Sequence, residues 1–169
     1  MKLLNTYKAL LLVLIFSLPI TTVRADEEDD RAVSIGQILQ VYATVHDPLV
    51  ADNLKKAQDG AKTLGTFVSQ WISENPNSAQ KADVLNIEKA GSTLAAAEDL
   101  DDARKAFIQL SQGTIALIRA DKSLQAKWQL FYCPMVAKNQ GYWTQPLGEQ
   151  LANPYMGGTM PGCGSKKPW

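Results

Sequence analysis

The residues best suited to chemistry contain sulfur and lie close together near the end of the chain. Beyond the first 25 residues, every cysteine and methionine falls between positions 133 and 163. They are Cys133, Met135, Met156, Met160 and Cys163. Thiolates and thioethers are soft donors, which select soft metal ions such as Cu(I). The cluster therefore points to metal handling or to a disulfide bond, and it names no reaction.

The order of these residues suggests how they could meet. The sequence Cys-Pro-Met at 133–135 is mirrored by Met-Pro-Gly-Cys at 160–163, with turn-forming residues at 153–158 between them. A chain folded back at these turns would bring two thiols and two thioethers together. Zinc calls for more Cys or His ligands, and the only histidine, His46, is far away in the sequence. Such a site would suit Cu(I), with Cys133, Met135, Met160 and Cys163 as its ligands.

The first 25 residues have the composition of a cleaved secretory signal. Lys2 and Lys8 lead into an apolar run at 9–20, and a small residue stands at the predicted cleavage site. The run of about twelve residues is shorter than the roughly 20 that a membrane-spanning helix needs. We therefore expect an exported protein with no membrane span after cleavage of residues 1–25. Residues 26–31 are predicted to be a disordered acidic lead.

The charge of the mature chain argues against nucleic acid as a partner. Removing the signal's three basic residues from the 17 present leaves 14 basic against 17 acidic residues, a formal charge of −3. Binding to nucleic acid phosphates calls for a basic face. The remaining length, about 144 residues, suits one domain with its own core.

A disulfide bond between the two cysteines is a simpler alternative to a metal site in an exported protein. Such pairs are most often joined as a disulfide, and closing a loop of this length stabilises the fold by about 3–4 kcal/mol in the chain-entropy model. The methionines would then fill gaps over an apolar surface. The protein would be a disulfide-stapled periplasmic interaction domain without metal. Its partner surface would comprise Tyr142, Trp143, Asn153 and Tyr155.

Residues 32–120 predict an all-α fold. Apolar residues recur at steps of three and four in four stretches, each of which gives a helix with one apolar face. These stretches run from Ile35 to Val45, Leu54 to Trp71, Val84 to Leu94 and Leu100 to Leu117. Turn or cap residues separate them at Asp47-Pro48, Asp52-Asn53, Asn75-Pro76 and Glu98-Asp99. Four helices with short connections predict an antiparallel four-helix bundle.

Residues 121–169 are expected to be a mostly irregular C-terminal segment of the same domain. Positions 133–169 hold six Gly and five Pro, which disfavours another long helix. Residues 127–132 predict a short strand, which could belong to a short β-hairpin. Aromatic residues are dense in this segment, and their rings would anchor it by packing against the helices.

Nothing in the sequence predicts an enzyme. With one histidine there is no evident Ser-His-Asp or Cys-His arrangement, and no Gly-rich phosphate loop follows a strand. His46 is expected at a helix end, where a cation is favoured by the helix dipole. The acidic residues at 98–102 mark a helix start for the same reason.

The C-terminal segment contains five short motifs in order, which are Tyr132-Cys133-Pro134-Met135, Trp143-Thr144-Gln145, Asn153-Pro154-Tyr155-Met156-Gly157, Met160 and Cys163-Gly164. They resemble those of a bacterial family of exported domains with no assigned activity. Members of that family also occur fused to the C-terminus of periplasmic adaptor subunits of copper and silver efflux systems. The likeness covers residues 132–164 closely and the helical part loosely.

The resemblance implies a periplasmic location and a connection with copper or related soft metals. By position, four sulfur residues match those of the family, namely Cys133, Met135, Met160 and Cys163. Met156 stands where other members often carry an aromatic residue, so we leave it out of the predicted site. We expect a Cu(I)- or Ag(I)-binding module of heavy-metal efflux or resistance. Its predicted partner is a periplasmic efflux adaptor or another metal-resistance protein.

Overall fold

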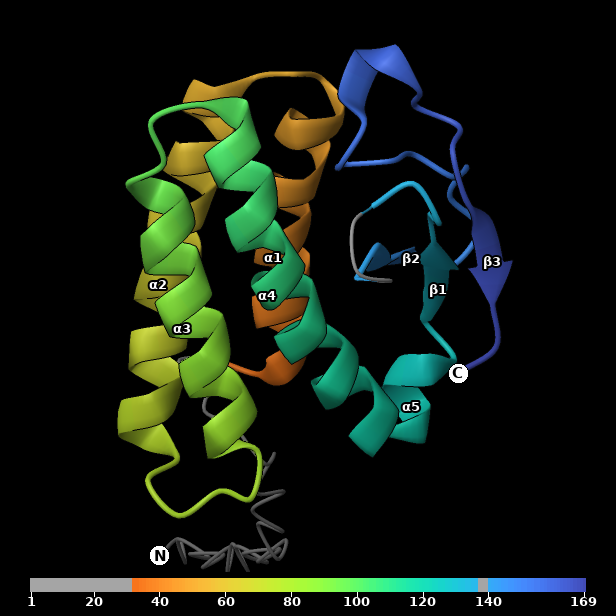
Figure 1. Cartoon of the computed structure of the whole chain (residues 1–169). Coiled ribbons are helices and arrows are strands. Elements are labelled where there is room, and N and C mark those ends of the chain that lie inside the picture. Colours follow the sequence, from red (N-terminus) through yellow and green to blue (C-terminus); the bar gives the residue numbers. More distant parts are fainter. Residues whose placement is uncertain (1–31, 137–139) are drawn as a thin grey trace, which may run out of the picture. The chain divides into compact units, whose positions relative to one another are not determined.

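The computed structural model describes residues 32–136 and 140–169 (Figure 1). The predicted signal peptide (1–25) and acidic lead (26–31) lie outside the described residues. The long helices are α1 (Ile35–Val50), α2 (Leu54–Glu74), α3 (Lys81–Ala95) and α4 (Leu100–Ala120). They are followed by α5 (Lys122–Gln125), β1 (Trp128–Tyr132), β2 (Tyr142–Pro146), the 3-10 turn η2 (Gly157–Thr159) and β3 (Ser165–Lys167).

Three of the four long helices begin at a side chain that caps the backbone. Ser34 accepts a hydrogen bond from the Gln37 N–H and Gln37 bonds back to the Ser34 N–H, which is a capping box. Asn53 caps α2 and Asp99 caps α4 in the same way, through a side-chain oxygen. The predicted helix starts are therefore set by local chemistry as well as by the apolar pattern.

The break predicted between the first two helices at Asp47-Pro48 is wrong, whereas the break predicted at Asp52-Asn53 is confirmed. α1 continues through Pro48 to Val50, and the chain turns only at Asp52, whose φ of 53° lies in the left-handed region. Because Pro48 has no N–H, the Thr44 carbonyl lacks its usual helical hydrogen bond. Gly60 of α2 lies directly against this carbonyl, and any side chain there would collide with it. Proline and glycine thus let α1 and α2 approach closely.

Each long helix packs against the next one along the chain, and α1 also contacts α4. Figure 1 shows the four helices side by side. Their buried residues follow the predicted stripes, including Leu39 and Tyr42 of α1, Leu64 of α2 and Ile87 of α3. The predicted mostly helical fold with four long helices is confirmed, and we call α1–α4 the helical body.

Residues 121–169, the C-terminal segment, contain more regular structure than predicted. The predicted strand is β1, and it lies in the middle of a three-stranded antiparallel sheet of order β2-β1-β3. Phe131 pairs with Trp143 of β2 and with Lys166 of β3. The sheet contacts the helical body through α4. A hairpin with an added third strand thus replaces the mostly irregular segment that composition suggested.

Within residues 32–136 and 140–169, no helix is long and apolar enough to cross a membrane.

Candidate functional site

Sheet pairing brings the two cysteines together. Cys133 directly follows β1, and Cys163 lies two residues before β3, whose Ser165 pairs with Tyr132 at the end of β1. The Cys133 N–H extends the β1–β2 ladder by donating to the Gly141 carbonyl at 2.9 Å. The two Sγ atoms are 2.6 Å apart, which is nearer to the length of a disulfide bond than to the contact distance of two separate thiols. Two residues that are 30 positions apart in the sequence therefore form one dithiol site.

The loop that carries Cys163 is organised by one buried side chain, Asn153. Its Nδ2 donates to the Cys163 carbonyl at 2.6 Å, and its Oδ1 accepts from the N–H groups of Tyr155 and Met156 at 2.8 and 3.1 Å. Its own N–H donates to the Pro161 carbonyl. Asn153 is 0% exposed, so these bonds satisfy groups that have no access to water. The position of Cys163 thus depends on a polar residue ten positions earlier.

The two thiols differ in exposure, and the pKa of one of them is shifted. Cys133 is fully buried, whereas Cys163 is half-buried. A hydrogen bond with Cys133, together with partial burial, raises the pKa of the Cys163 thiol, and the N–H of Met135 acts in the opposite direction. Cys163 therefore holds its proton more tightly than an ordinary cysteine does.

The predicted thioether ligands lie on the turns that carry the thiols. Met135 is 61% exposed and Met160 is 37% exposed, so neither side chain is used to fill the core. The backbone N–H of Met135 faces the Cys163 thiol, and the Met160 carbonyl accepts from the Cys163 N–H at 3.1 Å. Met156, by contrast, is half-buried and packs against the core. The structure thus brings the two cysteines together with two exposed methionines on adjacent backbone.

An arginine on α4 fastens the loop to the helical body. Arg104 donates to the carbonyls of Pro154 and Leu49 at 3.0 and 3.2 Å and forms an ion pair with Asp52. The second carboxylate oxygen of Asp52 accepts from the Gly158 N–H at 2.9 Å. This N–H and the Arg104 guanidinium lower the pKa of Asp52. The turn after α1 therefore holds the loop after Asn153 through charge and backbone contacts.

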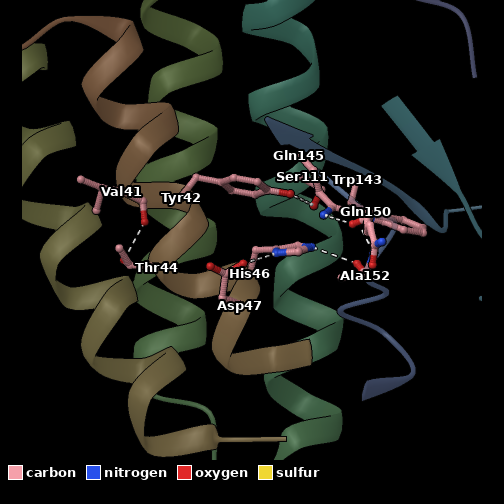
Figure 2. A network of polar contacts seen from close by, with 10 residues as sticks. All are labelled: Val41, Tyr42, Thr44, His46, Asp47, Ser111, Trp143, Gln145, Gln150 and Ala152. Atoms are coloured by element: carbon pink, nitrogen blue, oxygen red, sulfur yellow. Dashed lines mark hydrogen bonds and ion pairs between the residues drawn. The ribbon is translucent and has the colours of Figure 1, made fainter. Parts of the chain in front are cut away.

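A second contact joins α1 to the segment and is drawn in Figure 2. His46 is buried, with Nδ1 2.8 Å from a carboxylate oxygen of Asp47 and Nε2 3.1 Å from the Ala152 carbonyl. Gln145 of β2 holds the same stretch, because its Oε1 accepts from the Ala152 N–H and its Nε2 donates to the Gln150 carbonyl. The N–H and the carbonyl of Ala152 therefore both have side-chain partners.

Aromatic rings fill the space between the helical body and the sheet. Phe107 of α4 stacks on Tyr42 of α1 at 5.3 Å and meets the Tyr155 ring edge-on at 5.7 Å. Trp143 of β2 packs against both Tyr155 and Phe131. Burial raises the pKa of Tyr42 to about 12, and its hydroxyl oxygen lies 3.1 Å from the Oγ of Ser111. The Tyr42 hydroxyl therefore stays protonated at neutral pH.

The predicted partner surface is wrong for three of its four residues. Trp143 and Asn153 are 0% exposed and Tyr155 is 8% exposed, because their rings and amide hold the segment together. Only Tyr142 reaches the surface. The anchoring of the segment by aromatic rings, which the sequence predicted, takes these side chains away from any partner.

Sequence reasoning missed the polar residues that anchor the segment, His46 and Arg104 above all. Each bonds to a main-chain carbonyl far along the chain, at Ala152 and Pro154. Such bonds carry no spacing signal, since any residue can supply the carbonyl. His46 lies near the C-terminal end of α1 but before its last turn, because the helix continues to Val50, and it is buried there.

No three His, Cys, Asp or Glu side chains gather to hold a metal ion among residues 32–136 and 140–169. The candidate site consists instead of the two thiols and the neighbouring methionines.

A family model described as "Protein of unknown function (DUF3347)" matches residues 38–126. This match spans the helical body and α5. No curated protein and no solved structure matches the chain. Because the match covers more than half of the 169 residues, the chain belongs to the DUF3347 family.

Proposed function

We propose that this protein is a periplasmic module that binds Cu(I) or Ag(I) between Cys133 and Cys163, with Met135 and Met160 as further donors. One observation carries the proposal, namely that the fold brings the sulfur atoms of two cysteines 30 residues apart side by side, so that a small separation of the two would admit an ion between them. Two thiolates suit monovalent soft ions, which accept few ligands and prefer sulfur over oxygen.

The surroundings of the dithiol support a site that exchanges its metal. Buried Cys133 supplies a water-excluded side, where charge interactions are stronger, and half-buried Cys163 leaves a route for entry. The exposed thioethers of Met135 and Met160 are available to an incoming ion. Gap-filling methionines would have been buried instead.

The location and the partner belong to the same proposal. The first 25 residues have a signal-like composition, and the Cys-Pro-Met and Met…Cys-Gly motifs resemble those of domains fused to copper and silver efflux adaptors. We therefore propose a role in heavy-metal efflux or resistance, in which the ion passes to an efflux adaptor or a related protein. The DUF3347 membership itself brings no activity.

The second candidate is a disulfide-stapled domain without metal, which the same proximity of thiols favours. Closing the 30-residue loop would stabilise the C-terminal segment by about 3–4 kcal/mol in the chain-entropy model. The partner surface first predicted for this candidate is mostly buried, so only Tyr142 of that set remains available.

A competition titration tests the metal proposal. Reduced protein is titrated with Cu(I) without oxygen against a chromophoric Cu(I) chelator, and we expect it to withdraw one ion per chain. A Cys133→Ser/Cys163→Ser variant should lose affinity by on the order of 100-fold or more, since both anionic donors are gone. A Met135→Leu/Met160→Leu variant should lose about tenfold.

Met156→Leu is the matched control, because Met156 is half-buried and lies outside the proposed site. Its Cu(I) affinity should equal that of the unmodified protein. If the reduced protein takes no Cu(I) from the chelator, or if the double cysteine variant binds as well as the parent, the metal proposal fails. If protein isolated from cells then shows no thiol that can be alkylated, this result would support the disulfide-stapled candidate.

A further inference from the structure

The two thiols of the candidate site differ in how an outside molecule can reach them. Cys133 is 0% exposed, and its backbone is held by the Gly141 carbonyl. The turn around it is tight, because a Cβ at Gly141 would collide with the Cys133 carbonyl and lie 2.8 Å from the Cβ of Val136. A reagent in solvent therefore has no direct path to the Cys133 sulfur.

Cys163 has the opposite surroundings. It is half-buried and follows Gly162, where a Cβ would meet nothing within 4 Å. Its Sγ is also the nearest reaction partner for Cys133, at 2.6 Å. When a half-buried thiol lies against a fully buried one, the accessible cysteine can attack an external disulfide and the buried one can resolve the product. Access, and not a lowered pKa, selects Cys163 as the attacking residue.

We propose that the pair exchanges a disulfide with an external thiol–disulfide partner, with Cys163 as the attacking cysteine and Cys133 as the resolving one. The Cys163 thiolate attacks one sulfur of an external disulfide, whose S–S bond breaks and releases one thiolate that takes up a proton. The Cys133 thiolate then attacks Cys163 Sγ and expels the second external thiolate. Two protein thiols are oxidised to one disulfide, and the external disulfide is reduced to two thiols.

This activity goes beyond the proposed function because it needs no metal. It would also regulate that function, and this consequence alone rests on the metal proposal: a Cys133–Cys163 disulfide offers no thiolate to Cu(I). Reduction by an external thiol would start again at Cys163 and restore the site.

The test uses the reduced, metal-free full chain and oxidised glutathione as the external disulfide. Cys133→Ser should accumulate a mixed disulfide at Cys163, because the resolving thiol is missing. In Cys163→Ser, the adduct at Cys133 should form at least about tenfold more slowly than the adduct at Cys163 does in Cys133→Ser, since the Cys133 sulfur is buried. The parent should end as an internal disulfide, two hydrogens lighter by intact mass, with little adduct.

The two single variants are matched controls for each other, since each keeps one thiol and gains one hydroxyl. A second measurement avoids the variants: limiting iodoacetamide on the reduced parent, followed by peptide mapping, should label Cys163 before Cys133. Equal labelling of both thiols, equal adduct rates in the two variants, or a parent that keeps two glutathione adducts would overturn the assignment. None of these results depends on Cu(I), so the metal proposal can fail while this one stands, and the reverse also holds.

Discussion

The helical body and the C-terminal segment are held together by different forces. In the helical body, buried residues are almost all apolar and repeat at helical spacing, so its stability is spread over many apolar contacts. In the segment, single polar side chains bond to backbone groups far away in the sequence, as Asn153 does with Cys163 and Arg104 with Pro154. The first region depends on a periodic pattern, whereas the second depends on individual polar residues in addition to the aromatic rings that it packs against the helical body.

This difference bears on the thiol site. Loss of one apolar contact weakens the whole helical body, because its helices pack around one core, which Trp128, Phe131 and Trp143 of the segment also join. Loss of one anchor in the segment should loosen the loop around Cys163 while α1–α4 stay folded. The distance between the two thiols would then change without global unfolding, as the proposed metal binding and disulfide exchange require.

A core truncation in the helical body should have the largest effect. Ile87 of α3 is 0% exposed, and its side chain lies where a Cβ at Gly113 of α4 would collide. Ile87→Ala should lower the free energy of unfolding by about 2–5 kcal/mol, since it removes buried methyl groups and leaves a cavity. Urea unfolding followed by far-UV circular dichroism measures this loss.

The control lies on the same helix. Leu85 is 42% exposed, so Leu85→Ala should change stability by no more than about 0.5 kcal/mol. Equal losses in the two variants would show that the stripe assigned to α3 does not carry the core.

The helical body was predictable because its information is local and periodic. Apolar residues at steps of three and four gave all four long helices, and caps such as Asn53 and Asp99 fixed two of their starts. Pro48 misled because a proline is usually a boundary, whereas here the free Thr44 carbonyl is accommodated by Gly60 of the next helix. That compensation is a tertiary contact, which one sequence cannot reveal.

The segment was only partly predictable. The mirrored Cys-Pro-Met and Met-Pro-Gly-Cys sequences suggested that the cysteines meet, and the structure does bring Cys133 and Cys163 together. β3 could not be predicted, since Ser165–Lys167 has no apolar alternation and forms only by pairing with β1. Burial of Trp143 and Asn153 was missed because aromatic and amide side chains look alike in a sequence whether they face a partner or the core.

An intermediate effect is expected from removing the buried amide of the segment. Asn153→Ala leaves the Cys163 carbonyl and the N–H of Tyr155 without partners, which should cost about 1–3 kcal/mol. Hydrogen exchange should speed up at residues 153–163, while residues of α2 and α3 keep the protection of the parent. Formation of the Cys133–Cys163 disulfide should also slow, since Cys163 is no longer held in place.

Asn86→Ala is the control, because Asn86 is an exposed residue of α3. It should leave both the exchange pattern and disulfide formation unchanged. If Asn153→Ala instead speeds exchange equally in α2 and α3, the segment and the helical body unfold as one unit, and the contrast between them is lost.

The smallest effect should come from charge at the turn after α1. The Gly158 N–H and the Arg104 guanidinium lower the pKa of Asp52, so its carboxylate stabilises the fold above the ordinary value of 3.8, and this contribution is lost as the pH falls through the lower folded value. Because the Asp52 side chain is 44% exposed, we expect less than about 1 kcal/mol after screening by solvent. Asp52→Asn should therefore destabilise the protein at pH 7 and have a smaller effect at pH 2. Glu149→Gln, at an exposed position of the same segment, should show no such difference in urea midpoints between the two pH values. A loss for Asp52→Asn that is equally large at pH 2 would mean that packing of the loop, and not its charge, depends on this residue.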